Sequence, residues 1–62
     1  MRDALRAYYT EKYGRVVGEL ELCIARVPEH EDRALEVVAR EVEWDFFCEW
    51  DCGLDDWMEH WA

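Results

Sequence analysis

Residues 41–51 read Glu-Val-Glu-Trp-Asp-Phe-Phe-Cys-Glu-Trp-Asp, and this stretch decides which fold the sequence predicts. Acidic and apolar residues alternate along it, and only Phe47 interrupts the alternation. A β-strand points successive side chains to opposite faces, so it would place the carboxylates on one face and the aromatic rings on the other. On a helix, counted from residue 41, the apolar side chains fall at about 100, 300, 140, 240, 340 and 180°, which makes no single stripe. We therefore predict a strand over residues 42–51.

The segment 15–27 fits either a strand or a helix. Leu20, Leu22 and Ile24 alternate with other residues, as in a strand. As a helix, most of its apolar residues share one face and only Leu22 lies outside it. Gly18, and Gly14 just before the segment, each disfavour a helix by about 1 kcal/mol relative to alanine. β-branched Val and Ile favour a strand, so we predict a strand here as well.

Two helices are predicted around these strands. The first covers residues 3–13, with Asp3 as its N-cap and Gly14 as its stop. The second covers residues 29–41, with Pro28 in its first turn. Acidic residues lie near its start, and it contains two i,i+4 pairs in the favourable order. These pairs are Glu29–Arg33 and Glu36–Arg40.

The last segment, residues 54–62, fits a short helix or a third strand. Trp57, Glu59 and Trp61 alternate as in a hairpin, whereas Leu54, Trp57, Met58 and Trp61 share a helical face. We favour the helix. The 62 residues then form one α+β domain over 1–62, of order α-β-α-β with a C-terminal helix or third strand. The alternative is an all-α three-helix fold.

The negative charge is concentrated near the C-terminus. Residues 41–62 contain eight acidic residues and no Lys or Arg, and the formal net charge of the chain is −9. Direct binding to nucleic acid or anionic lipid is disfavoured, because both require a basic surface. A basic protein surface is the favoured partner. The predicted partner-binding residues are Glu41, Glu43, Asp45, Glu49, Asp51, Asp55 and Asp56.

A row of carboxylates on a strand suggests a specific hypothesis for function. Side chains on one face of a strand are spaced about 6.6–6.8 Å apart. This spacing is close to the axial distance between every second phosphate of one DNA strand. The chain would then act as a nucleic-acid mimic that inhibits a nucleic-acid-binding protein. Small acidic inhibitors from phages and mobile elements, including anti-CRISPR and anti-restriction proteins, work in this manner, and the analogy is one of size and charge. The plainer interpretation of the same face is a solvated surface that keeps the chain soluble.

Four tryptophans suggest an alternative function. A 62-residue chain has a small core, and four indoles exceed what one such core can hide. Tryptophan is enriched in interfaces, so the alternative is a structural or accessory homo-oligomer, at its simplest a homodimer. The predicted oligomer interface is Trp50, Trp57 and Trp61.

The cysteines and histidines give weak signals. Cys48 and Cys52 have a C-x3-C spacing, and Cys23, His30 and His60 lie elsewhere. Zinc sites usually use C-x2-C or C-x4-C pairs and four ligands, so a zinc-binding module is a further alternative rather than the main interpretation. We predict no metal, no cofactor and no enzymatic activity, because no catalytic motif is present. An odd number of cysteines and no membrane-length apolar run favour a reduced, cytoplasmic protein.

Overall fold

The computed structural model describes residues 1–60. Over this range the chain forms four helices and no strand: α1 (Arg2–Tyr13), α2 (Gly18–Ala25), α3 (Leu35–Trp50) and α4 (Leu54–His60). The predicted α+β fold is therefore wrong, and the all-α alternative is closer. None of these helices is long and apolar enough to cross a lipid bilayer.

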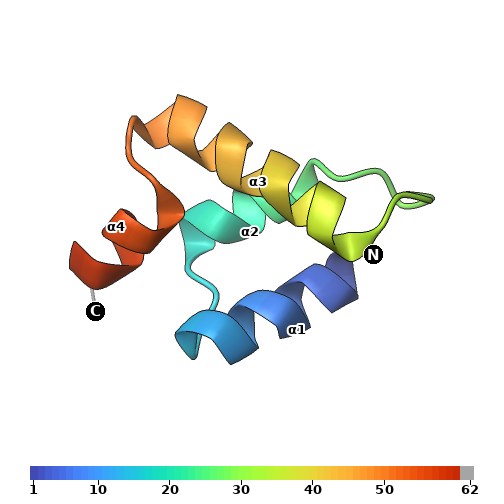
Figure 1. Cartoon of the computed structure of the whole chain (residues 1–62), viewed down its shortest axis with the longest axis horizontal. Helices are drawn as coiled ribbons and strands as arrows, with labels where there is room; N and C mark the ends of the chain where they lie inside the picture. Colours follow the sequence, from blue (N-terminus) through green and yellow to red (C-terminus); the bar gives the residue numbers. More distant parts are fainter. Residues whose placement is uncertain (61–62) are drawn as a thin grey trace.

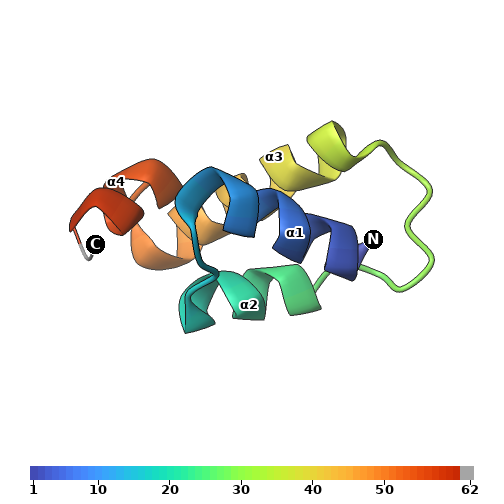
Figure 2. The same ribbon diagram turned by 90° about the horizontal axis from the view of Figure 1, so that it is seen from below.

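The helices α1, α2 and α3 pack against one another in pairs, and α4 packs against α3. Figure 1 shows α3 along one edge of the molecule, with α1 and α2 below it and α4 folded back from its C-terminal end. In the view from below, α1 and α2 lie side by side, and the N-terminus lies near the end where α3 begins (Figure 2). One long side of α3 is thus left uncovered by the other three helices.

The core lies between the helices. Its largest fully buried side chains are Tyr9 and Phe46, and no polar or charged residue other than Tyr9 is buried among the described residues. Burying a large apolar side chain contributes about 1.5–3 kcal/mol, so these residues dominate the stability of so small a domain. The buried set is Leu5, Tyr9, Leu20, Cys23, Ile24, Val27, Val38, Ala39, Val42, Phe46, Leu54 and Met58.

Helix α1 confirms the first predicted helix. Gly14 ends it in the left-handed conformation at φ 82°, and its N–H donates to the Thr10 carbonyl at 2.7 Å. Glycine adopts this conformation without the steric cost that a side chain brings, so Gly14 is a strong stop signal. The predicted N-cap is wrong: the capping position is Met1, and no side chain within residues 1–60 caps the helix.

Tyr9 ties α1 to α3. Its ring is fully buried, and its hydroxyl lies 3.0 Å from the Ala39 carbonyl oxygen and 3.1 Å from Glu43 Oε2. Burial and the nearby Glu43 carboxylate raise the pKa of Tyr9 above its ordinary value. The phenol therefore stays protonated and donates to an oxygen of α3.

Helix α2 replaces the strand predicted over residues 15–27. Leu20 and Ile24 are fully buried, whereas Leu22 is 57% exposed. This pattern is that of a helix, because residues four apart share a face and residues two apart do not. Gly18 lies in the first turn, where the helix-breaking effect of glycine is small.

Helix α3 replaces the strand predicted over residues 42–51. Val38, Val42 and Phe46 form its buried stripe at a spacing of four residues. The carboxylates do not share one face: Glu41 and Asp45 lie on one flank of this stripe, Glu43 lies on the other, and Asp51 follows the last residue of the helix. The alternation of acidic and apolar residues therefore has a helical explanation.

The helix predicted over residues 29–41 begins later than expected. Residues 28–34 form a loop, and α3 starts at Leu35 after Ala34. Within the loop, the carboxylate of Glu31 accepts the Arg33 backbone N–H at 3.0 Å and the Arg33 guanidinium at 2.9 Å. This local bonding competes with a helix. Neither predicted i,i+4 ion pair forms among the described residues.

Helix α4 confirms the helix expected after Gly53. Leu54 and Met58 are buried, and the Trp57 ring meets Phe46 of α3 edge to face at 5.6 Å. A third strand is excluded for Leu54–His60. Residues 61 and 62 lie outside the described range.

Candidate functional site

Two of the predicted partner-binding acids bind an arginine of their own chain. Arg26, at the end of α2, lies 2.8 Å from Asp45 and 2.6 Å from Glu49. Hydrogen bonds to both carboxylates raise the pKa of Arg26 further above its ordinary value. These acids hold α2 to α3 and are not a free acidic row.

Three more of these acids also have partners within the molecule. Glu41 pairs with Arg33, and Glu43 accepts from the Tyr9 hydroxyl. Asp55 accepts from the Tyr13 hydroxyl and lies 4.0 Å from the Lys12 ammonium. Burial and the Asp55 carboxylate raise the pKa of Tyr13 above its ordinary value.

Asp51 and Asp56 are the predicted acids that remain exposed without an ion pair in the described part of the chain. Asp51 is the C-cap of α3, in the left-handed conformation at φ 53°. The structure therefore does not bring the seven acids together. Whether any of them binds a partner stays a prediction.

The predicted tryptophan interface divides in two. Trp50 and Trp57 are half-buried and pack against the core, with ring centroids 6.4 Å apart. Trp61 lies outside the described residues. Trp50 and Trp57 therefore use much of their apolar surface within the fold itself.

The exposed aromatic surface lies instead on the uncovered side of α3. Trp44 is 67% exposed, and Val37 and Phe47 are each 43% exposed. The rings of Trp44 and Phe47 stack with centroids 5.7 Å apart. We call this surface the outer face of α3. It consists of Val37, Arg40, Trp44, Phe47 and Cys48 of the helix, together with Asp51, the C-cap that follows its last residue.

From the sequence alone, no role follows for Val37 or Phe47, Arg40 is predicted only to pair with Glu36, and Trp44 lies on the aromatic face of the predicted strand. A helical projection of residues 41–51 carries the missing signal. Val42, Phe46 and Trp50 fall at about 100–180°, and Phe47, Trp44 and Cys48 fall at about 240–340°. The segment thus contains two apolar stripes. The first builds the core and the second is the outer face of α3.

Large exposed apolar groups gathered on one face are characteristic of protein-binding surfaces. Scattered single residues are normal, and Leu22, 57% exposed on α2, is one such case. Trp44 and Phe47 differ from it because they contact each other. Tryptophan at the centre of an apolar patch is also among the residues most enriched in binding hot spots.

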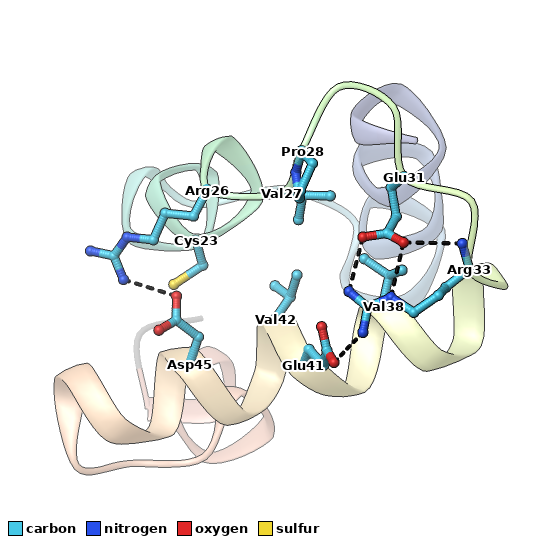
Figure 3. A pocket seen from close by; sticks show the side chains of 10 residues that line it. All are labelled: Cys23, Arg26, Val27, Pro28, Glu31, Arg33, Val38, Glu41, Val42 and Asp45. Atoms are coloured by element: carbon cyan, nitrogen blue, oxygen red, sulfur yellow. Dashed lines mark hydrogen bonds and ion pairs between the residues drawn. The ribbon is translucent and has the colours of Figure 1, made fainter.

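A half-open cavity of about 250 Å³ lies beneath the loop of residues 28–34 (Figure 3). Val38 and Val42 contribute to its apolar lining, and Arg26 and Arg33 contribute its positive charge. Figure 3 shows each guanidinium already bonded to carboxylates of the same cavity. Both positive charges of this lining are therefore already paired with its three carboxylates, those of Glu31, Glu41 and Asp45, and no cation is left over to bind an anionic ligand.

Glu31 is the most strongly held acid of this cavity. The Arg33 guanidinium and the Arg33 backbone N–H lower its pKa from 4.5 to about 2. The hydrogen bonds of the Arg33 guanidinium to Glu31 and to Glu41 in turn raise the pKa of Arg33. The cluster therefore stays ionised at neutral pH and fixes the loop against α3.

The cysteines are separated. Cys23 is buried, Cys52 is half-buried and Cys48 is exposed. Burial and the nearby Asp45 carboxylate raise the pKa of Cys23 to about 11, so its thiol is unreactive. No group of three or more His, Cys, Asp or Glu side chains is placed to hold a metal ion within residues 1–60. His30 and His60 are both exposed.

What the arrangement offers is an apolar contact surface on a helix whose opposite side is buried in the core. Comparisons of the chain with protein-family models, with curated proteins and with solved structures found no match.

Proposed function

We propose that this protein is a structural or accessory homo-oligomer that associates through the outer face of α3. The observation that carries the proposal is the exposed, stacked pair of Trp44 and Phe47. Covering such a pair with apolar surface is favourable by about 25 cal/mol per Å² removed from water. The rest of the chain supports the pair, because α3 is anchored by the buried Phe46 and by the Tyr9 hydroxyl.

A second copy brings a second charge of −9, and this repulsion opposes association. Five of the acids at residues 41–55 already have partners in their own molecule. At about 0.15 M salt the Debye length is about 8 Å, which screens the remaining exposed charges. The apolar contact is therefore the deciding contribution at physiological ionic strength.

Sedimentation velocity of the wild type and of Trp44→Ser, from micromolar to millimolar concentration, tests the proposal. We expect the wild type to form an oligomer and Trp44→Ser to sediment as a monomer. Leu22→Ser is the matched control, because Leu22 is also exposed but lies on α2. Far-UV circular dichroism checks that all three are folded. A wild type that stays monomeric throughout, or a Leu22→Ser variant that dissociates equally, refutes the proposal.

The inhibitor hypothesis stays a second prediction and receives less support. It needs a continuous acidic face, and the carboxylates of Asp45, Glu49 and Glu41 bind arginines of their own chain instead. Its remaining candidates are Asp51 and Asp56, both exposed. Binding to a basic protein that weakens steeply with salt, and is lost in Asp51→Lys/Asp56→Lys, would restore it.

A further inference from the structure

The outer face of α3 carries a regular pattern. Val37, Arg40, Trp44, Phe47 and Asp51 are spaced alternately three and four residues apart. This is the a/d spacing of a coiled coil, in which each such residue faces a partner helix. The face can therefore meet another helix packed lengthwise against α3, whose 16 residues span about 24 Å at 1.5 Å per residue.

The two charged residues of this pattern have no ion-pair partner in the described part of the chain. Arg40 is exposed and takes part in no salt bridge within residues 1–60. Most other basic side chains do pair with carboxylates, namely those of Arg2, Arg6, Lys12, Arg26 and Arg33. Asp51 is likewise exposed and without an ion pair over this range. Two opposite charges thus lie one at each end of the aromatic pair.

Orientation decides what these charges meet in a second copy. In a parallel pair of helices each residue lies beside its own counterpart, so Arg40 faces Arg40 and Asp51 faces Asp51. In an antiparallel pair with the two-fold axis between residues 45 and 46, Arg40 faces Asp51. Trp44 then faces Phe47 of the other copy, and every contact occurs twice, as a two-fold interface requires.

We propose that the occupant of the outer face of α3 is a second copy of this chain, with its α3 antiparallel. This inference rests on the proposed self-association and adds its geometry. The aromatic layers at the centre exclude water, and an Arg40–Asp51 pair closes each end. Complementary charge selects this orientation, because the parallel one places like charges together in two layers.

The test uses two charge-reversed variants, Arg40→Glu and Asp51→Lys. Alone, each places like charges together at both ends of its own dimer. We expect each to raise the dimer dissociation constant by about tenfold or more, since each dimer loses two attractive pairs and gains two repulsive ones.

Mixing the two variants in equal amounts supplies the complementary measurement. In the antiparallel heterodimer the two altered side chains carry opposite charges and face each other at one end. At the other end the unaltered Asp51 of the first variant faces the unaltered Arg40 of the second. We therefore expect the mixture to associate as tightly as the wild type.

Asp51→Lys places a lysine in the left-handed conformation and is the variant at risk of misfolding. Asp51→Asn, which tolerates that conformation, replaces it if circular dichroism shows a loss of helix. In the antiparallel dimer, Asp51→Asn alone weakens association, and added to Arg40→Glu it restores part of the lost affinity. In a parallel dimer it strengthens association in both backgrounds, because it removes the repulsion between two Asp51 side chains.

The outcomes separate the two proposals. A dimer that needs Trp44 overturns the antiparallel arrangement and leaves self-association standing in two cases. In the first, the mixture shows no rescue. In the second, each variant alone associates as tightly as the wild type, as a parallel pair of helices would. A wild type that is monomeric at every concentration overturns both. Rescue in the mixture, with each variant weak alone, supports the arrangement.

Discussion

Replacing Leu20 or Leu22 by alanine distinguishes a helix from a strand at residues 18–25. Leu20 is fully buried and Leu22 is 57% exposed. Truncating a buried leucine to alanine lowers the free energy of unfolding by about 2–5 kcal/mol. At an exposed helical position the same change stays within about 0.5 kcal/mol. At this length the free energy of unfolding of the whole domain is expected to be only about 3–9 kcal/mol, so Leu20→Ala removes a large part of that stability.

Urea denaturation followed by far-UV circular dichroism measures the difference. For a chain of this size the free energy of unfolding falls by about 1 kcal/mol per molar urea. Leu20→Ala therefore lowers the urea concentration at which half of the protein is unfolded by about 2 M or more. Leu22→Ala leaves the midpoint nearly unchanged. Sucrose or trimethylamine oxide in all samples keeps the weaker variant folded enough to measure. Equal losses at both positions would place both leucines on one buried face and refute the helix.

Three further results are expected. Tyr9→Phe lowers the free energy of unfolding by about 0.5–1.5 kcal/mol in urea, because it removes the buried hydroxyl that reaches α3. Glu31→Gln makes the melting temperature fall less between pH 4.5 and about 2 than it does in the wild type. A carboxyl group with a lowered pKa stabilises the fold above its ordinary pKa, and this stabilisation is lost as the pH falls through the pKa of the folded state. A melting temperature that depends on pH as in the wild type contradicts the role of Arg33. In thiol labelling of the folded protein at a concentration where it is monomeric, Cys48 reacts first and Cys23 reacts only on unfolding, because Cys23 is 1% exposed with a pKa of about 11. Early labelling of Cys23 contradicts its burial.

Local signals in the sequence predicted the two terminal helices. Gly14 after an amphipathic run marks the end of α1, and Gly53 before Leu54 marks the start of α4. Such signals act within one turn of helix and do not depend on tertiary packing. The prediction that Asp3 is the N-cap was wrong because an acidic residue is also favourable inside the first turn of a helix, which is where Asp3 lies.

The loop at residues 28–34 could not be separated from a helix by composition. Pro28, three acids and Arg33 occur in the order that a helix start also shows. The deciding contacts are the hydrogen bonds of Glu31 to Arg33 and the ion pair of Arg33 with Glu41 in α3. The last of these depends on the tertiary fold, and its formation was not predictable from spacing.

The error at residues 42–51 has a physical cause. Periodicity assumes that one face of an element is apolar and the other polar, and α3 is apolar on two faces. Four of its acids, at positions 41, 43, 45 and 49, bind Arg26, Arg33 or Tyr9. Testing the apolar residues for two stripes instead of one would have favoured the helix and pointed to Trp44 and Phe47. The angular positions of these apolar residues around a helix could be predicted from the sequence. Which of the two stripes is buried could not be predicted, because it depends on how the other helices pack.

The unequal surroundings of the described indoles have an optical consequence. Trp50 and Trp57, with centroids 6.4 Å apart and packed against the core, are close enough for excitonic coupling in the near ultraviolet. Trp44 stands in solvent, so its fluorescence emission lies further to the red and is open to acrylamide quenching. Ellipticity near about 290 nm therefore follows folding, and quenching of emission follows assembly, within one unlabelled sample.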